Sequence, residues 1–297
     1  MDPDITAHLR CPVCRGELAA GPAAGSAALG CPAGHRFDLA RQGYANLTAG
    51  RAPHTGDTAA MVAARADFLR AGHFGHLSAA LAAAAARAVG ELRAAPGAPR
   101  APGGGRVAPP LVVDAGAGTG HHLAAVLDAV PAARGLALDA SKPALRRAAR
   151  AHPRAAAALA DTWGRLPLAD GCAAVLLDVF APRNGPEFRR VLAPGGTLLV
   201  VTPEPAHLAE VVAALDLLRV DPDKPARLVA GLPGFAVGAG TVHTADLALT
   251  HAEVAALVAM GPSAWHTDPA ARAARLAALP PTVHTRASVR LTAFRPV

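Results

Sequence analysis

Three of the four cysteines of this chain and one histidine stand close together near its start, in the spacing C-x2-C-x16-C-x3-H. These residues are Cys11, Cys14, Cys31 and His35. Thiolate sulfur and imidazole nitrogen are ligands that tetrahedral Zn²⁺ prefers, and two short knuckles present them here. Four protein ligands leave no coordination position open for a substrate, so the spacing predicts a structural zinc site. A thiol redox pair is the alternative interpretation of the first two cysteines.

A glycine-rich loop further along the chain has the features of a nucleotide-cofactor site. It follows an apolar run and contains Asp114, Gly116, Gly118 and Gly120. Glycines allow a tight turn and a close approach of the backbone to a ligand. Asp139 ends the next apolar run, 25 residues after Asp114, and an acid at that place typically binds ribose hydroxyls. The alternative is a Rossmann-like scaffold that binds no cofactor.

Two details indicate which cofactor the loop would take. The loop reads D-x-G-x-G-x-G rather than G-x-G-x-x-G, and a Pro-Gly-Gly turn at 194–196 leads into a later apolar run. In both respects the chain resembles the class I methyltransferase fold, over about residues 107–297. The resemblance implies that S-adenosylmethionine is the cofactor and that Asp139 holds its ribose. It also implies that Asp161, after the third strand, lies near the adenine.

The elements that would position these residues alternate regularly from residue 111 onward. Apolar runs predict strands at 111–115, 135–139, 156–161, 173–179 and 197–202, separated by helices at 121–130, 142–151 and 187–192. This alternation implies a doubly wound parallel sheet. Two further strands, at 235–242 and 288–294, flank helices at 252–260 and 269–279. The expected fold is α/β, with an N-terminal zinc-ribbon-like module and a class I, Rossmann-like methyltransferase domain.

Composition divides the chain into three expected parts. Residues 1–48 hold the metal motif, residues 49–110 form a helical connector and linker, and residues 111–297 form the methyltransferase domain. In the connector, Asp57 or Thr58 is expected to cap a first helix, and a second, alanine-rich helix follows from Leu77. Residues 94–110 are almost entirely Ala, Pro, Gly and Arg, which predicts a linker. Residues 19–30 are similarly small and predict a loop between the knuckles.

The bulk composition indicates in which compartment the protein is expected and which class of partner it could bind. Of the 297 residues, 52% are hydrophobic, much of this is alanine, and no uncharged run is long enough to span a membrane. The chain start lacks the basic and apolar segments of a signal peptide, so a cytoplasmic protein without membrane contact is expected. The net charge of +7 is concentrated in segments 141–160 and 269–297, which contain no acid. Such segments suit a polyanion, or else form solvated helix faces.

Longer segments resemble the bacterial 23S ribosomal RNA (guanine-N1)-methyltransferases, and the resemblance covers nearly the whole chain. It rests on the metal knuckles and on matches at 37–47, 56–74, 180–182, 202–208 and 260–265. The actinobacterial branch resembles tylosin-resistance enzymes, which modify a domain II hairpin at the macrolide-binding exit tunnel. The resemblance implies zinc at the four ligands above, a homodimer, and a 23S rRNA hairpin as substrate. It also implies cofactor contacts at Phe74, His122, Leu123 and His207.

Methylation at guanine N1 requires that the N1 proton leave, so a general base or a stabiliser of charge on O6 is expected. Asp178 and Asn184, near the tip of the fourth strand, and His207, after the fifth, are the candidates. A polar loop residue or a helix cap is the alternative role for each. Phe180 or Trp265 could stack on the target base.

Two other functions stay open at the level of the sequence. A methyltransferase that acts on a small natural product would share the glycine loop, but it leaves the metal motif and the basic segments unexplained. A nucleic-acid-binding protein with an inactive cofactor fold is at odds with the intact loop and with Asp139.

Overall fold

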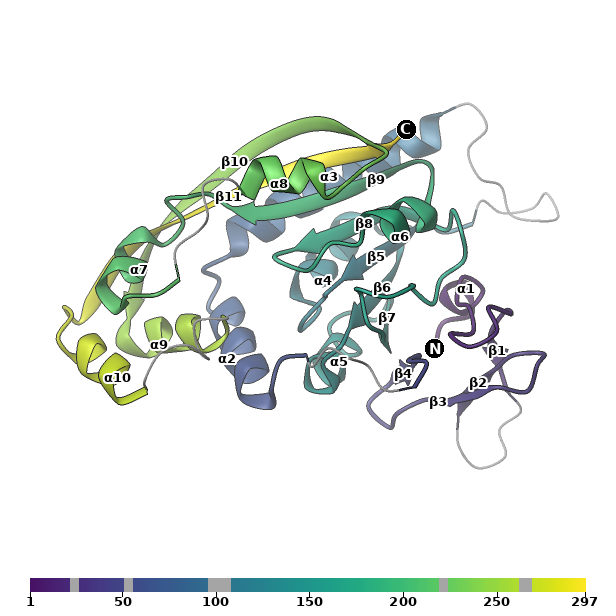
Figure 1. The fold of residues 1–297 in the computed structure, drawn as a ribbon, viewed down its shortest axis with the longest axis horizontal. Coiled ribbons are helices and arrows are strands. Elements are labelled where there is room, and N and C mark those ends of the chain that lie inside the picture. The colour runs from purple at the N-terminus through teal and green to yellow at the C-terminus, as the bar shows by residue number, and fades with distance from the viewer. Residues whose placement is uncertain (22–26, 51–55, 96–107, 219–223, 262–268) are drawn as a thin grey trace.

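The computed structural model describes residues 1–297 apart from 22–26, 51–55, 96–107, 219–223 and 262–268, and it centres on an eight-stranded sheet (Figure 1). The strand order is β10-β11-β9-β8-β5-β6-β7-β4. The central strands are β5 (Leu111–Ala115), β6 (Arg134–Asp139), β7 (Ala155–Leu159), β8 (Ala173–Val179) and β9 (Leu192–Pro203). They pair in parallel, which confirms the predicted centre of the sheet.

Two long strands extend the sheet in the antiparallel sense. β11 (Thr282–Pro296) pairs with β9, and β10 (Phe235–Thr250) pairs with β11. The sheet is therefore mixed rather than wholly parallel. The predicted strand at 235–242 stopped too early because the polar residues His243 to Asp246 interrupt the apolar pattern, whereas pairing with β11 continues through them to Thr250.

Helices lie on both sides of the sheet (Figure 1). They are α1 (Pro3–Thr6), α2 (Ala59–Arg70), α3 (Gly75–Ala94), α4 (His121–Ala129), α5 (Lys142–Ala148), α6 (Gly185–Val191), α7 (Ala209–Leu215), α8 (Lys224–Ala230), α9 (His251–Ala259) and α10 (Pro269–Ala277). Thr58 is the N-cap of α2, because its side chain accepts the Met61 N–H at 3.3 Å. The predicted linker falls mostly on residues 96–107, outside the described residues.

The two faces of the sheet bury separate cores because successive strand residues point to opposite sides. Val112 belongs to the core that α3 and α4 cover, with Leu81 among its members. Val113 belongs to the opposite core, where Phe188 of α6 packs. Ile5 and Leu9 of the N-terminal module are fully buried in this second core. The module therefore shares its apolar interior with the sheet.

The N-terminal module is built from a small three-stranded sheet and one strand of the large sheet. The small sheet contains β1 (Ala19–Ala20), β2 (Ala28–Gly30) and β3 (Arg36–Asp38), so the ends of the predicted 19–30 loop are strands and residues 22–26 lie outside the described residues. β4 (Tyr44–Asn46) pairs in parallel with β7 at the edge of the large sheet. The division of the chain at residue 48 stays a prediction. Within the described ranges, no helix is both long and apolar enough to cross a membrane.

Candidate functional site

The four predicted zinc ligands come together. One ligand atom each from Cys11, Cys14, Cys31 and His35 lies within 4.8 Å of the other three. The Cys14 and Cys31 sulfurs are 3.5 Å apart, and the Cys31 sulfur is 3.3 Å from His35 Nδ1. A tetrahedron of about 2.3 Å bonds places its ligands roughly 3.8 Å apart, so the donor set fits Zn²⁺ in type and size.

Local backbone geometry prepares the first knuckle for a metal. The Cys14 N–H points at the Cys11 sulfur at 3.5 Å, and the Cys11 N–H donates to Gly16 O at 2.8 Å. Burial opposes ionisation of the Cys31 thiol, yet hydrogen bonds from His35 and Cys14 lower its pKa to about 6. A thiolate is the form that binds zinc, so the lowered pKa of Cys31, in the second knuckle, suits a zinc ligand.

The glycine loop connects β5 to α4 and takes a shape that only glycine adopts without strain. Gly116, Gly118 and Gly120 have φ of +82°, +54° and +76°. A Cβ on Gly116 would lie 2.6 Å from the Cβ of Ala181, and one on Gly120 would lie 3.0 Å from Cα of Ala148. The loop thus lies close against its neighbours, and a side chain at Gly116 or Gly120 would not fit without a shift.

Two carboxyl groups flank the glycine loop, that of buried Asp114 and that of half-buried Asp139. Asp139 at the end of β6 accepts the Gly118 N–H at 2.8 Å and the Ser141 N–H at 2.7 Å, while burial raises its pKa. Asp114 is only 2% exposed, and its Oδ1 finds no hydrogen-bond donor among the described residues. Burial, with a smaller effect of Asp139, raises the pKa of Asp114 to about 7. An orphaned acceptor at this place fits a cationic group of a bound cofactor.

Asp161 lies two residues beyond β7, at the same edge of the sheet as Asp139. Its Oδ1 accepts the Trp163 N–H at 3.0 Å and shapes a turn that Gly164 closes by donating to Asp161 O at 3.1 Å. Asp161, which the resemblance places near the adenine, therefore belongs to a turn held by hydrogen bonds. That Asp161 contacts the adenine stays a prediction.

A guanidinium that no sequence motif predicts lies beside the glycine loop. Arg65 of α2 pairs with Asp57 and donates to Met260 O at 2.8 Å. Its Nη1 is 3.5 Å from the position that a Cβ on Gly118 would occupy. Ser141 Oγ donates to Asp57 O at 2.7 Å, which ties this pair to the end of β6. No local motif marks Arg65, because its partners are distant in the sequence.

Three rings gather where β8 and β9 end. The ring centroids of Phe74 and His207 are 6.0 Å apart, and Phe180 lies 6.4 Å from Phe74 and 6.1 Å from His207. Phe74 is buried, whereas Phe180 is 43% exposed and has a left-handed φ of +55°. The rings thus form an apolar wall that ends in one accessible aromatic surface.

In the first turn of α4, the His122 side chain lies against Ser78, whereas the Leu123 side chain points into the core. His122 Nδ1 lies 3.0 Å from Ser78 Oγ, and burial lowers its pKa to about 3, so the ring is neutral. The Leu123 side chain is 1% exposed and packs beneath Gly135 in the core. A cofactor contact at Leu123 would therefore use its main chain, which belongs to a helix N-terminus.

The three catalytic candidates differ in what their side chains do. Asp178 is fully buried, with its Oδ1 3.5 Å from Arg183 Nε. Asn184 is the N-cap of α6, and its amide donates to Trp163 O at 2.8 Å and to Gly164 O at 2.9 Å. These contacts match the alternative role of a helix cap. His207 Nδ1 accepts the Ser288 N–H at 3.1 Å, which leaves the proton of the neutral ring on Nε2.

The two arginine-rich segments also differ. Four arginines of segment 269–297 pair with acids distant in the sequence, and these ion pairs are Arg275–Asp216, Arg286–Asp246, Arg290–Glu204 and Arg295–Glu91. Segment 141–160 keeps more of its charge, since the residues exposed on and after α5 are Lys142, Arg146, Arg147 and Arg150. Arg154 instead bonds four main-chain carbonyls at the end of α4. Trp265, the second predicted stacking residue, lies outside the described residues.

Comparison with known proteins gives four findings. A zinc-ribbon family model described as the N-terminal part of RlmA matches residues 9–49. A candidate 23S rRNA (guanine-N(1)-)-methyltransferase of Micromonospora griseorubida is 63% identical over the whole of both chains. The 23S rRNA (guanine(748)-N(1))-methyltransferase of Streptomyces fradiae is 50% identical, again over the whole of both chains. A solved complex of the Haloferax volcanii Trm112 activator with a methyltransferase has a TM-score of 0.48 at 18% identity, covering 82% of this chain and 99% of the other.

Proposed function

The chain belongs to the 23S rRNA (guanine-N1)-methyltransferases, and we propose on this basis that it methylates N1 of a guanine in a domain II hairpin of 23S rRNA. The observation that carries the proposal is identity of 63% and 50% over full length with relatives of that description. The relative in Streptomyces fradiae acts on guanine 748 by its name, and we infer that the same guanine is the target here. Methylation of a small natural product is not favoured, because it explains neither these relatives nor the zinc ribbon.

The glycine loop and the residues around it are proposed to hold S-adenosylmethionine, which supplies a methyl group on a sulfonium when bound. Asp114 offers a buried acceptor suited to the cofactor ammonium, and Arg65 offers a guanidinium suited to its carboxylate. Asp139 is proposed to face the ribose and Asp161 the adenine. Gly116 to Gly120 allow the main chain to approach the ligand closely.

The ring cluster at the ends of β8 and β9 is proposed to receive the target base. Phe180 is the accessible ring, and it can stack on an unpaired guanine. His207 carries its proton on Nε2, so it is a donor and suits the negative charge that develops on O6 when N1 loses its proton. Asp178, buried behind Arg183, suits a positioning role for that arginine. Asn184 suits its observed structural role.

Zinc at the four N-terminal ligands is structural, since the donor set is complete and closed. We propose that the module it stabilises contacts the RNA hairpin. We also propose a homodimer, because the resemblance implies one, and light scattering of the purified protein tests it. A ribosomal RNA substrate suits the predicted cytoplasmic location. Expression in a macrolide-sensitive host is expected to raise resistance to tylosin-type macrolides.

One assay tests the proposed function against its alternatives. Purified protein is incubated with labelled S-adenosylmethionine and unmodified 23S rRNA, and reverse-transcription stops are mapped. A single stop at a domain II hairpin guanine is expected, because a methyl on N1 blocks base pairing. Label that enters only a small molecule would support the natural-product enzyme. Tight RNA binding without label transfer would indicate an inactive fold.

A further inference from the structure

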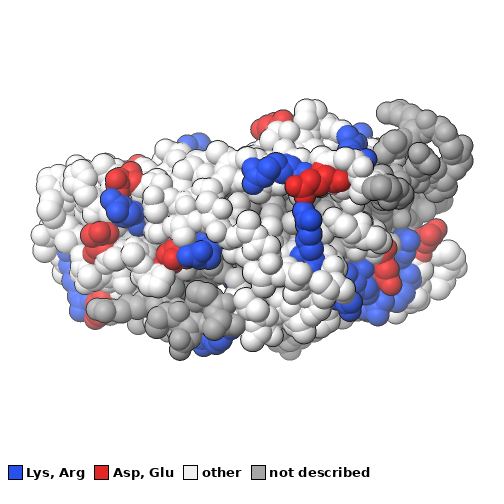
Figure 2. Space-filling model, turned by 90° about the horizontal axis from the view of Figure 1, so that it is seen from above, with Lys and Arg blue, Asp and Glu red and all other residues white. Residues whose placement is uncertain are grey.

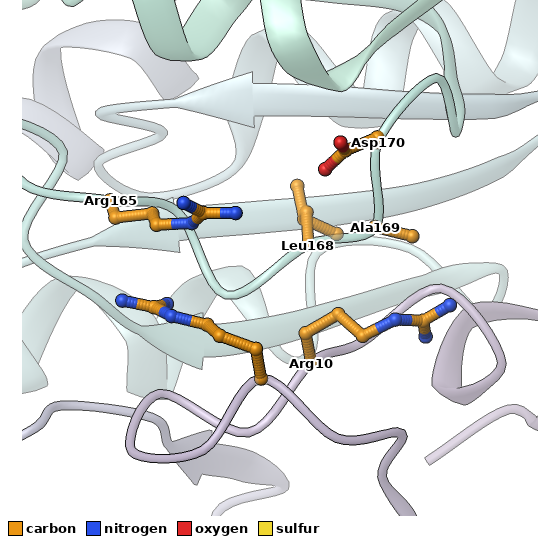
Figure 3. Close-up of a pocket in the computed structure, with 6 residues that line it drawn as sticks. Arg10, Arg165, Leu168, Ala169 and Asp170 are labelled. Atoms are coloured by element: carbon orange, nitrogen blue, oxygen red, sulfur yellow. The ribbon is translucent and has the colours of Figure 1, made fainter.

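A cavity of about 350 Å³ lies between the N-terminal module and the loop that follows β7 (Figure 3). Its lining residues are Arg10, Arg15, Arg165, Leu168, Ala169 and Asp170. Figure 3 shows Arg10 and Arg165 on opposite sides of the gap, one from the module and one from the loop. We propose that this cavity, the arginine cleft, binds a phosphodiester group of the RNA substrate. The assignment rests on the proposed function and adds to it a defined contact.

The two walls of the arginine cleft are fixed to each other by main-chain hydrogen bonds. The Arg10 N–H donates to Pro167 O at 2.9 Å, and the Ala169 N–H donates to His8 O at 2.9 Å. An antiparallel bridge between Leu9 and Leu168 lies between these bonds. Such a junction holds the cleft in one shape, so a ligand can bind without first ordering the backbone.

The remaining two arginines are also carried by anchored backbone. The Arg15 N–H donates to Cys11 O at 2.9 Å, so the zinc knuckle positions Arg15. The loop that carries Arg165 is held by α6, because the Leu166 N–H donates to Glu187 Oε2 at 2.8 Å. Loss of zinc is therefore expected to displace Arg15.

The charges around the arginine cleft leave an excess of guanidinium groups. Asp170 is committed to Arg190, whose Nη1 lies 2.6 Å from Asp170 Oδ1, and Glu17 lies 3.5 Å from Arg10 with its side chain 82% exposed. Within the described ranges, no carboxylate forms an ion pair with Arg15 or Arg165. Arg and Lys side chains gather at the right-hand end of the face in Figure 2, with acids among them. Two uncommitted guanidinium groups in a concave site match a phosphate, which accepts several N–H bonds at once.

An exposed aromatic side chain close in the sequence to a residue of the arginine cleft is in keeping with an RNA ligand. Trp163 is 52% exposed and stands two residues before Arg165. The turn that carries it is fixed by Asn184, whose amide donates to Trp163 O at 2.8 Å. Unpaired bases stack on such rings while arginines hold the adjacent phosphate. A hairpin loop offers both groups together.

The test compares two variants of the full-length zinc-loaded protein. The double variant Arg15→Gln/Arg165→Gln removes the uncommitted charges, and Arg36→Gln removes an exposed charge of the same module outside the cleft. Binding to a fluorescent transcript of 23S rRNA domain II is measured at several KCl concentrations. In the double variant, Kd is expected to rise about tenfold. The negative slope of log K against log salt is expected to become shallower by roughly 0.7–0.9 for each phosphate contact that is lost. Arg36→Gln is expected to stay within about twofold of wild type.

Zinc content and S-adenosylmethionine affinity are measured on the same samples and are expected to be unchanged, which excludes misfolding. An unchanged Kd and salt slope in the double variant, with wild type active on the transcript, would overturn the arginine cleft alone. An equal loss in Arg36→Gln would also overturn it, since the effect would then be one of net charge. Failure of wild type to bind or methylate the transcript would instead refute the proposed function itself.

Discussion

The buried carboxyl of Asp114 should make cofactor binding depend on pH in the neutral range. Its pKa is raised to about 7, chiefly by burial, so the free protein holds it half protonated near neutrality. The cofactor ammonium favours the ionised form, and binding therefore releases a proton and strengthens as pH rises. With a pKa of 7, the ionised fraction of Asp114 is about 0.76 at pH 7.5 and about 0.09 at pH 6, which alone would weaken binding about eightfold at pH 6. An α-amino group has a pKa of about 7.7–8.0, so roughly a third of the cofactor amine is neutral at pH 7.5, and the net loss of affinity at pH 6 is about five- to sixfold.

Isothermal titration of S-adenosylmethionine at the two pH values measures this change, and the dependence of the heat on the buffer reports the released proton. Asp114→Asn keeps the shape of the side chain but cannot ionise, so its affinity is expected to be weaker and to vary less than about twofold over the same range. A flat wild-type profile would refute the reasoning. A five- to sixfold change that persists in Asp114→Asn would assign the titration to another group.

Three further variants test other parts of the site. Gly116→Ala places a Cβ 2.6 Å from that of Ala181, so it should weaken cofactor binding about tenfold or more. Gly50→Ala is its control, because Gly50 also has a left-handed φ of +77° but has open space around it, and it should leave binding unchanged in the same titration. Cys14→Ser should lose zinc, seen by metal analysis, and most RNA methylation, while cofactor affinity survives; full methylation without zinc would contradict the role of the module. Asn184→Ala removes the α6 cap and the bonds to the 162–164 turn, so chemical denaturation should show a loss of about 1–3 kcal/mol. A loss no greater than that of the exposed Arg70→Ala would argue against this structural role.

The zinc ligands and the centre of the sheet were predictable because their signals are local. Short Cys and His spacings leave few ways to fold, and buried parallel strands such as Val112 and Val113 in β5 are continuous apolar runs. Strand β10 was predicted only in part, because its second half, from His243 to Asp246, is held by pairing rather than by an apolar pattern.

Features that depend on distant partners were not predictable from the sequence. β4 joins the large sheet through β7, more than a hundred residues away (44 against 157). Arg65 of α2 lies beside Gly118 although the two are more than fifty residues apart in the sequence. The arginine-rich C-terminal segment loses much of its apparent excess charge to acids such as Glu204. Net charge along a segment records neither of these pairings, so it overstated the basic surface there.

The identity of the methylated nucleoside is the most direct test of the proposed function. Labelled 23S rRNA from the reaction is digested to nucleosides and compared with standards by chromatography. The label is expected in 1-methylguanosine alone, and loss of the signal with Gly116→Ala would tie it to this site. Label in another nucleoside, or none in RNA under conditions where the protein binds both zinc and S-adenosylmethionine, would contradict the proposal.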